Sequence, residues 1–340
     1  MCGLVGQASI NRQAIKNLDK KLDCMSSLIS HRGPDGKGMW INSEANVGLA
    51  HRRLSIIDLS NSGAQPMIGN NESVITYNGE IYNHPELKKS LSNEWNFKSS
   101  SDTECILAAY DKFGDNCLDH FRGMFAFAIW DEKRKRLLCA RDRFGIKPFY
   151  YTIIDNIFYF ASEAKALLPF LPEIKTDETA LAEYLTFQYT IGEKTLFKDI
   201  FQLMPGHKLV IENEKLIIEK YWDVSYEIDY DKSPKYFETR LAELLEESVS
   251  LHGRSDVPVA SYISGGIDSS LIFRMSQNNQ STSSLGFHGR FMEYPGYDES
   301  KFANAAITNS NEKLHVIDIV AEDFKKYFED VIYHLDFPVA

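Results

Sequence analysis

Short apolar or alternating runs, each bounded by glycine, asparagine, aspartate or charged residues, fill the N-terminal part of the chain and predict β-strands. Helical spacing of apolar residues predicts two helices, Ile15–Ile29 and Thr103–Phe113, the second with Asp102 as its cap. Many strands with few helices predict an α+β domain of stacked antiparallel sheets covered by helices. The predicted strands are Val5–Ile10, Val47–Ala50, Ser73–Tyr77, Met124–Asp131, Arg136–Ala140 and the hairpin pair Phe149–Ile154 and Ile157–Ala161.

A different pattern begins near residue 235, where apolar positions mark one face of an amphipathic helix: Phe237, Leu241, Leu244, Leu245, Ser248 and Val249. Strands then alternate with helices, which predicts an α/β doubly wound parallel sheet. The elements are strand Val257–Ile263, a helix from Asp268, strand Ser283–His288, a helix near Tyr297–Thr308, strand Leu314–Val320 and helix Ala321–His334. We therefore expect two domains, over residues 1–215 and 235–340, with a junction in the polar residues 206–234.

The composition is that of an ordinary folded protein, with 44% hydrophobic and 25% charged residues. A net charge of −11 argues against a general surface for nucleic acid or anionic membranes, so we expect neither as a partner. No apolar run reaches the length of a membrane span. The five cysteines form no C-x-x-C pair, which argues against a disulfide framework or a zinc site and predicts a reducing, cytoplasmic location.

The second residue, Cys2, is the first candidate for chemistry. Cysteine is small enough for the initiator methionine to be removed, which would leave a thiol and a free α-amine on one residue. An α-amine titrates near pH ~7.7–8.0, so it can act as the base that activates the thiol. The ordinary explanation is an arbitrary residue at a frayed terminus, and Cys2 alone does not decide between the two.

The segment Ser264-Gly265-Gly266-Ile267-Asp268-Ser269-Ser270 follows a predicted strand directly and opens a predicted helix. Two glycines let the backbone approach an anion closely, the hydroxyls add donors, and the helix N-terminus adds its positive field. No lysine follows as in a Walker loop, and Asp268 could hold a Mg²⁺ that bridges phosphates. The order of strand, glycine-rich loop and helix predicts a phosphate-binding loop.

This loop resembles the pyrophosphate loop of ATP-pyrophosphatases, enzymes that split ATP between the α- and β-phosphates. Leu285-Gly286-Phe287 is similar to the segment of that family beside adenine, and Tyr297-Asp298-Glu299-Ser300 resembles the motif that follows it. The resemblance implies ATP as a substrate with Mg²⁺, the ion being held at Asp268. The ATP-binding residues that it implies are Ile263, Ser264, Gly265, Gly266, Asp268, Ser269, Ser270 and Leu285.

A set of motifs in the first part of the chain resembles a class II glutamine amidotransferase domain of the N-terminal-nucleophile hydrolase type. With the loop behind them, they are similar to glutamine-hydrolysing asparagine synthetases along essentially the whole chain. The motifs are Cys2-Gly3, His31–Asp35, His51–Ile56, Tyr77–Asn83, Ser101-Asp102, Gly123–Phe127 and Ala140–Pro148.

The resemblance assigns roles that fit the residue types. Arg53, which directly precedes Leu-Ser as in the family, would clamp the α-carboxylate of glutamine, while Glu80 and Asp102 would pair with its α-ammonium. Asn78 and the N–H of Gly79 would act as catalytic donors to the oxyanion formed when Cys2 attacks the side-chain amide. Each residue alone has an ordinary explanation, but their joint occurrence in order does not. His31 and His51 are expected to be scaffold residues.

By the same resemblance, ammonia released from glutamine would pass to an ATP-activated aspartate and give asparagine, AMP and pyrophosphate. Two alternatives stay open: an acceptor other than aspartate, such as a sugar or natural-product carboxylate, and a chain with only glutaminase or binding function. The motifs expected after Leu335-Asp336-Phe337-Pro338 do not follow in this sequence. We therefore expect a fragment or a natural truncation, in which one face of the second domain leaves apolar residues exposed. A homodimer is a further expectation.

Overall fold

The computed structural model describes residues 1–277, 282–293, 296–307 and 313–338. The chain divides into two compact units, which are described separately. Unit 1 consists of Met1–Val224 together with Leu335–Ala340, and unit 2 of Ser225–His334. The predicted helix end at Thr308 and the residues Val339 and Ala340 lie outside the described residues.

Unit 1 is built on two antiparallel sheets of six strands each. The first has the order β10-β8-β9-β1-β3-β2 and the second the order β12-β11-β7-β6-β5-β4. The first consists of β1 (Gly3–Ser9), β2 (Gly36–Ile41), β3 (Val47–Arg53), β8 (Tyr150–Ile154), β9 (Ile157–Ala161) and β10 (Phe201–Gln202). The second consists of β4 (Met67–Ile68), β5 (Val74–Ile81), β6 (Gly123–Asp131), β7 (Arg136–Arg141), β11 (His207–Glu212) and β12 (Lys215–Lys220).

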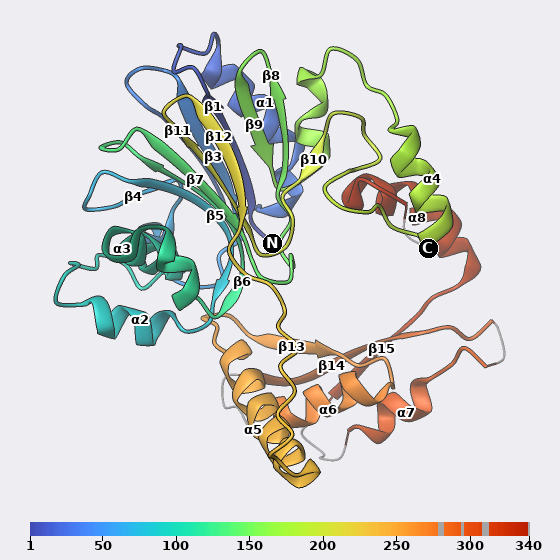
Figure 1. Cartoon of the computed structure of the whole chain (residues 1–340). Helices are drawn as coiled ribbons and strands as arrows, with labels where there is room; N and C mark the ends of the chain where they lie inside the picture. Colours follow the sequence, from blue (N-terminus) through green and yellow to red (C-terminus); the bar gives the residue numbers. More distant parts are fainter. Residues whose placement is uncertain (278–281, 294–295, 308–312, 339–340) are drawn as a thin grey trace. The chain divides into compact units, whose positions relative to one another are not determined.

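Unit 1 consists of stacked sheets with helices outside them (Figure 1). Three hydrophobic cores lie between these layers. One joins the first sheet to α1 (Leu18–Leu28), and another joins the second sheet to α2 (His84–Leu91) and α3 (Asp102–Phe113). The middle core lies between the sheets and contains Leu4, Leu49, Ala126, Cys139 and Phe160. All residues of β1 are buried because that strand has a core on each face. Unit 1 is thus a four-layer structure with helices outside two stacked sheets, as the sequence predicted.

The structure confirms all the predicted strands of unit 1, with ends shifted by a few residues. Two predictions are wrong. The cap of α3 is Ser101, whose hydroxyl accepts from Thr103 N at 3.2 Å, and Asp102 is already the first residue of the helix. The predicted junction 206–234 contains the hairpin β11–β12, which pairs with β7, so the change of unit comes only after Val224. The remaining elements of unit 1 include α4 (Glu178–Phe187), which the pattern did not predict.

Unit 2 contains a parallel sheet of three strands in the order β13-β14-β15. Its strands are β13 (Val259–Tyr262), β14 (Thr282–Arg290) and β15 (Lys313–Asp318), and its helices are α5 (Pro234–His252), α6 (Ile267–Ser276), α7 (Ser300–Ala305) and α8 (Ala321–Leu335, with Leu335 assigned to unit 1). Figure 1 shows α6 and α7 on one face of the sheet, as right-handed crossovers between successive neighbours require. The parallel sheet is confirmed, and a doubly wound arrangement with helices on both faces stays a prediction.

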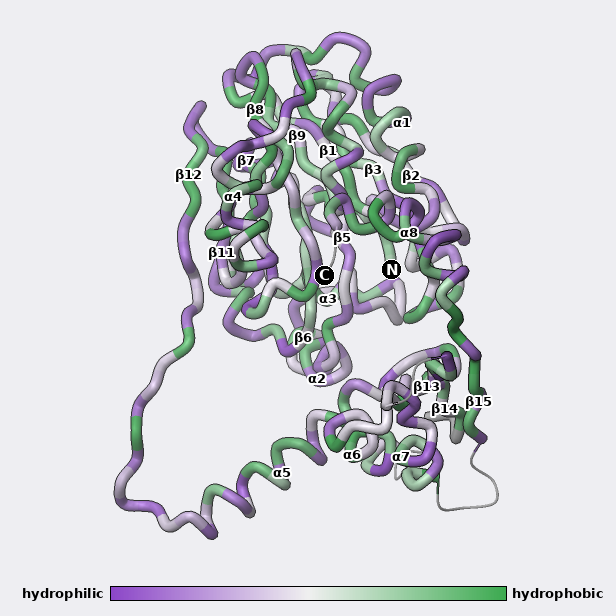
Figure 2. The backbone as a smooth tube through the Cα atoms, turned by 90° about the vertical axis from the view of Figure 1, so that its right-hand side faces the viewer, coloured by the Kyte–Doolittle hydropathy of each residue, from purple (hydrophilic) through white to green (hydrophobic). Residues whose placement is uncertain are grey.

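Unit 2 leaves much of its apolar surface exposed. Its buried core is formed by Ile263, Phe273, Ala303 and Ala306, and α5 and α8 contain no buried residue. In Figure 2 the colour of α5 alternates between hydrophobic and hydrophilic, which fits the predicted amphipathic helix. These exposures agree with the expectation that apolar residues on one face of the second domain stay uncovered. Within the described ranges, none of the helices has the length and hydropathy needed to cross a membrane.

Replacing Phe160 by alanine should destabilise unit 1 by roughly 3–5 kcal/mol, the usual cost of deleting a buried aromatic ring. Phe160 is fully buried between the sheets and stacks on Phe149 with ring centroids 5.4 Å apart. Urea unfolding followed by tryptophan fluorescence measures this, because the four tryptophans all lie in unit 1. Ile153→Ala, at a residue 47% exposed on the neighbouring strand, is the control and should cost little. Equal losses for both variants would contradict the assigned core.

Candidate active site

A cavity of about 260 Å³ in unit 1 brings the predicted glutaminase residues together. They come from four places in the chain: the chain start, β3, β5 and the first residue of α3. Sequence separations of up to a hundred positions are thus closed by the stacking of the sheets. The predicted residues that line the cavity are Cys2, Arg53, Asn78, Gly79, Glu80 and Asp102.

The Cys2 thiol is held at the wall of this cavity by the end of β3. Its Sγ accepts from Leu54 N at 3.3 Å and lies 3.5 Å from Leu54 O. Burial raises the pKa of the Cys2 thiol, so the group stays protonated at neutral pH until a base removes the proton. The Cys2 carbonyl accepts from Arg32 Nε at 2.9 Å, which fixes the backbone next to the thiol. The thiol is therefore oriented but not ionised.

The Met1 amine belongs to the same cavity wall. Burial lowers its pKa, and the positive charges of Arg32 and Lys147 lower it further. An amine in these surroundings is held more in its neutral, basic form than an exposed terminus would be. The surroundings thus favour a basic amine next to the Cys2 thiol.

Asn78 offers an unused hydrogen-bond donor at the cavity. The residue is 1% exposed, and its Nδ2 has no hydrogen-bond partner within the described part of the chain. A buried amide without a partner is costly, and such a group at a cavity wall is available to a ligand oxygen. The next residue, Gly79, has no room for a side chain, because a Cβ would lie 2.3 Å from Met124 O. The Asn-Gly pair thus lies inside β5 instead of forming the hairpin turn common for this dipeptide.

Arg53, which also lines the cavity, is held by the loop that follows β3. Its Nη1 donates to Ser60 O at 2.7 Å and its Nη2 donates to Asp58 O. Both contacts are to carbonyls, so the guanidinium keeps its charge and further N–H groups for an anion. Gly63 leaves space for this guanidinium, because a Cβ there would lie 2.3 Å from Arg53 Nη2.

The acidic side of the cavity consists of Glu80 and Asp102. Asp102 is 5% exposed, and its Oδ2 accepts from Tyr77 Oη at 2.7 Å and from Ile81 N at 3.0 Å. Burial raises the pKa of the Asp102 carboxyl, although these two hydrogen bonds oppose the shift. A bound ammonium group would favour the ionised carboxylate again. The cavity therefore has a cationic and an anionic wall, as an amino acid requires.

Two hydrogen bonds join the sheets directly beside the cavity. His51 Nε2 donates to Tyr77 O at 2.9 Å, and Thr76 Oγ1 donates to Ala50 O at 3.1 Å. Burial lowers the pKa of His51 to about 4, so the ring is neutral at physiological pH. His51 thus has the predicted scaffold position, and His31 contacts Glu163 instead of lining the cavity.

Sequence reasoning missed several residues of the cavity, above all Lys147 and Gln65. Lys147 is 6% exposed, and burial lowers the pKa of its ammonium group. Gln65 Oε1 accepts from Tyr77 N at 2.7 Å, which supports β5 next to Asn78. Lys147 lies in Ala140–Pro148, one of the motifs that carry the family resemblance, but the sequence analysis assigned it no role. Nothing in the local sequence distinguishes Gln65 or Gly63 from loop residues.

The predicted ATP residues of unit 2 lie in the loop that follows β13, in the first turn of α6 and on β14, which pairs with β13. Gly265 has φ +97° and a Cβ there would lie 2.8 Å from Glu299 O, so only glycine fits. The hydroxyls of Ser264 and Ser269 lie 2.9 Å apart and bond to each other and to the loop backbone. Ile263 is buried, and its carbonyl accepts from His288 Nδ1 at 2.8 Å. Gly266, Ser270 and partly buried Leu285 complete this group.

The carboxylate of Asp268 is the candidate ligand for a metal ion at this loop. Among the described residues, no group of three or more aspartate, glutamate, histidine or cysteine side chains is arranged to hold one. Asp268, in the first turn of α6, is an exposed carboxylate. A single carboxylate fits Mg²⁺, which usually takes its other ligands from phosphates and water. A carboxylate in this position fits an ion that is bound together with a nucleotide.

Comparisons with known proteins agree with the division of the chain into two parts. The family described as glutamine amidotransferase domain matches residues 1–222, and the family described as asparagine synthase matches residues 240–340. Among solved structures, glutamine phosphoribosylpyrophosphate amidotransferase of B. subtilis covers 93% of this chain and 81% of its own, at 15% identity and a TM-score of 0.49. At this identity and TM-score the likeness does not support a conclusion about the function of the chain.

Curated relatives match the chain from end to end. It is 35% identical to glutamine-hydrolyzing asparagine synthetase 1 of Bacillus subtilis, covering 100% of this chain and 54% of that protein. It is 33% identical to the putative glutamine-hydrolyzing asparagine synthetase 2 of Methanocaldococcus jannaschii, covering 99% and 68%. It is 35% identical to the amidase chry2 of Gibberella zeae, covering 96% and 50%. The chain thus spans about half the length of the first relatives it matches. With both family matches in the predicted order, the chain belongs to the glutamine-hydrolysing asparagine synthetase family.

Proposed function

We propose that unit 1 hydrolyses glutamine to glutamate and ammonia, with Cys2 as nucleophile after removal of Met1. The observation that carries this proposal is the cavity in which one thiol, one arginine, two carboxylates and an unused amide donor meet. A free amino acid with a neutral side-chain amide fits that combination. Scattered surface residues would not bring these groups together in one cavity.

In this mechanism Arg53 binds the α-carboxylate, and Glu80 with Asp102 binds the α-ammonium of glutamine. The clamp makes the attack of Cys2 on the side-chain amide effectively intramolecular. The α-amine of Cys2 takes the thiol proton as the carbon–sulfur bond forms. Asn78 Nδ2 and Gly79 N–H stabilise the oxyanion, each donor contributing about 2.7–4 kcal/mol in comparable sites.

Collapse of the tetrahedral intermediate breaks the carbon–nitrogen bond. The protonated α-amine returns its proton to the leaving nitrogen, which departs as ammonia and leaves a thioester on Cys2. A water molecule, deprotonated by the same amine, then attacks the thioester carbon and releases glutamate with the regenerated thiol. The positive charge of Lys147 near the amine would help to keep that amine in its neutral form, which can accept a proton.

For unit 2 we propose ATP binding at the loop Ile263–Ser270 with Leu285 near the base, and an aspartate carboxylate as the group that ATP activates. Ammonia from unit 1 would displace AMP from the aspartyl-adenylate and give asparagine. Asp268 would hold the Mg²⁺ that accompanies the nucleotide, and such an ion offsets phosphate charge. The support is the glycine geometry of the loop and the family membership.

The acceptor is the open part of this proposal. Relatives of similar identity are named asparagine synthetase or amidase, so the names do not decide between aspartate and another carboxylate. A substrate series followed by AMP release separates these acceptors. Aspartate is favoured because more of the named relatives are asparagine synthetases.

Cys2→Ala should abolish glutamate release from glutamine. Alanine is also small enough for Met1 to be removed, so the variant keeps the α-amine and loses only the thiol. Glutamate formation measured with a coupled dehydrogenase assay should fall by at least ~1000-fold, as expected when a nucleophile is lost. Cys24→Ala, at an exposed thiol outside the cavity, is the matched control and should retain activity.

A processing-resistant N-terminal extension supplies the second arm of this experiment. It converts the amine of residue 2 into an amide, which cannot act as a base, while the thiol remains. Turnover persisting in Cys2→Ala would contradict the nucleophile, and turnover persisting in the extended chain would contradict the base.

Gly63→Ala should raise the KM for glutamine roughly tenfold or more with little change in kcat. The new methyl group would displace the Arg53 guanidinium and weaken a charge-assisted contact worth about 1.5–3 kcal/mol. Gly36→Ala is the control, because a Cβ there reaches Arg53 Cβ only at 3.4 Å, an ordinary contact. A steady-state glutamine titration measures both. An unchanged KM in Gly63→Ala would show that Arg53 does not bind glutamine.

Asp268→Ala should weaken Mg-ATP binding about tenfold or more, because a lost charged ligand costs at least ~1.4 kcal/mol. Equilibrium dialysis with labelled ATP measures binding, and the glutaminase assay should give the wild-type rate. Asp330→Ala, an exposed carboxylate on α8, serves as the control. Wild-type affinity in Asp268→Ala would contradict its role, and no ATP binding by the wild-type chain would contradict the proposed ATP site.

A further inference from the structure

Unit 1 contains a buried group of charged side chains outside the glutamine cavity. Glu163 Oε1 accepts from Arg32 Nη1 at 2.8 Å and from His31 Nε2 at 3.0 Å, and Glu163 Oε2 accepts from Lys165 Nζ. Lys165 Nζ also lies 2.9 Å from Asp336 Oδ1. Apart from His31, the side chains are between 5% and 7% exposed. We call His31, Arg32, Glu163, Lys165 and Asp336 the Glu163 cluster.

One end of the Glu163 cluster contacts the nucleophile residue. Arg32 Nε donates to Cys2 O at 2.9 Å, while Arg32 Nη1 donates to Glu163. The remaining nitrogen, Nη2, is buried and has no hydrogen-bond partner among the described residues. The Glu163 carboxylate therefore orients the Arg32 guanidinium, whose Nε holds the Cys2 carbonyl. A shift of Glu163 would move the group that holds the Cys2 carbonyl.

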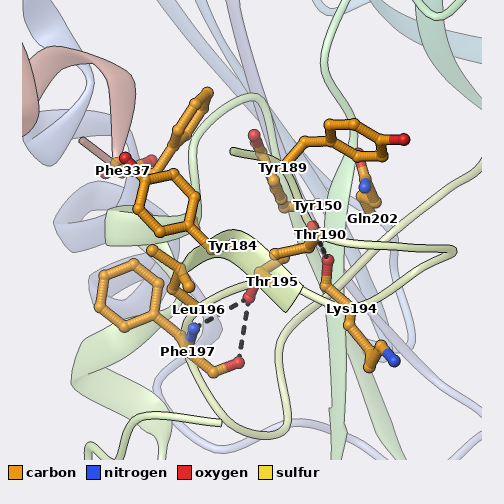
Figure 3. A pocket seen from close by; sticks show the side chains of 12 residues that line it. Tyr150, Tyr184, Tyr189, Thr190, Lys194, Thr195, Leu196, Phe197, Gln202 and Phe337 are labelled. Atoms are coloured by element: carbon orange, nitrogen blue, oxygen red, sulfur yellow. Dashed lines mark hydrogen bonds between the residues drawn. The ribbon is translucent and has the colours of Figure 1, made fainter. Parts of the chain in front are cut away.

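The other end of the Glu163 cluster is Asp336, from the short segment with which the chain returns to unit 1. Lys165 binds it twice, because Lys165 N also donates to Asp336 Oδ2 at 3.3 Å. The neighbouring Phe337 lines a cavity of about 230 Å³. Figure 3 shows Phe337, Tyr184 and Phe197 on one side of this cavity and Lys194 on the other. The segment is thus held by the ion pair and the hydrogen bond between Asp336 and Lys165, and Phe337 lies at the edge of an aromatic cavity.

The charges of the cluster depend on one another because they lie away from water. Burial favours the neutral form of Glu163, but hydrogen bonds from Arg32, Lys165 and His31 outweigh it and hold its pKa below the usual range. Removing one member of a buried pair leaves its partner uncompensated, whereas removing both members together is milder. Without Asp336, the Lys165 ammonium has only Glu163 among the carboxylates of the cluster. The Glu163 carboxylate would then shift toward Lys165 and away from Arg32.

We propose that Asp336 is a positioning residue for glutamine hydrolysis, acting on Cys2 through Lys165, Glu163 and Arg32. Seating of the segment around Asp336 keeps Lys165 between two carboxylates and leaves Glu163 aligned with Arg32. Arg32 then holds the Cys2 carbonyl so that the thiol faces the cavity. The glutaminase therefore works at its full rate only when residues 335–337 are seated in unit 1. The inference rests on the proposed glutaminase function of Cys2.

The test is a double-mutant cycle on the full chain with Asp336→Asn and Lys165→Met. Each single variant should lower kcat for glutamine hydrolysis by about 10- to 100-fold, the range produced by small misplacements of reacting groups. The KM for glutamine should stay within about twofold, since neither residue lines the glutamine cavity. The double variant should be no slower than the slower single variant, because both substitutions interrupt one path.

Lys194→Met is the matched control, because it breaks the ion pair of Lys194 with Glu183 at the same aromatic cavity but outside the Glu163 cluster. Its kcat should stay at the wild-type value. Alkylation of Cys2 by a diazoketone analogue of glutamine, mapped by mass spectrometry, should slow in Asp336→Asn and recover in the charge-retaining Asp336→Glu. Circular dichroism establishes that each variant is folded, and Lys165→Gln, which also removes the charge, replaces Lys165→Met if the latter does not fold.

Three results would overturn the inference while leaving the proposed function intact: wild-type kcat in Asp336→Asn, multiplicative losses in the double variant, or an equal loss in Lys194→Met. A wild-type chain without glutaminase activity would instead contradict the proposed function itself. The two failures are therefore distinguishable in the same set of assays.

Discussion

The face-to-face packing of the two six-stranded sheets is the constraint on which unit 1 depends. The middle core fixes the distance between the sheets, and the bonds from His51 to Tyr77 and from Thr76 to Ala50 fix their alignment. Both bonds join β3 to β5, the strands that carry Arg53 and Asn78. Because β1 pairs with β3, the same alignment brings Cys2 to this place. The cavity is a consequence of how two sheets stack.

The electrostatics of the cavity follow from its burial. Burial raises the pKa of the Cys2 thiol and of the Asp102 carboxyl, and it lowers the pKa of the terminal amine and of Lys147. Each shift disfavours a charge that has no partner yet. A substrate with an ammonium and a carboxylate would supply those partners. The cavity therefore stabilises charges mainly when a zwitterionic ligand is present, which agrees with the proposed order of binding before proton transfer.

The two units differ in how completely they bury their apolar residues. Unit 1 has three extended cores, whereas unit 2 has one small core and exposes apolar residues on α5 and α8. The loop geometry in unit 2 is nevertheless specific, since Gly265 needs its positive φ and close approach to Glu299. The proposal for glutamine accordingly rests on a complete cavity, and the proposal for ATP on a loop and its family.

The sequence by itself predicted the antiparallel and the parallel sheets, ten of the fifteen described strands, the family and six of the residues that line the cavity in unit 1. It could do so because periodicity follows burial on each strand, and because the motifs keep chemically specific residues in a fixed order. It failed at Asp102, where Ser101 is the cap, and at the hairpin β11–β12, because local polarity does not reveal pairing with β7. Lys147, Gln65, Gly63 and the contact of Asp336 with Lys165 were decided only by the tertiary structure. The roles proposed for these residues depend on their burial and on neighbours that are distant in the chain. Neither property can be predicted from the local sequence.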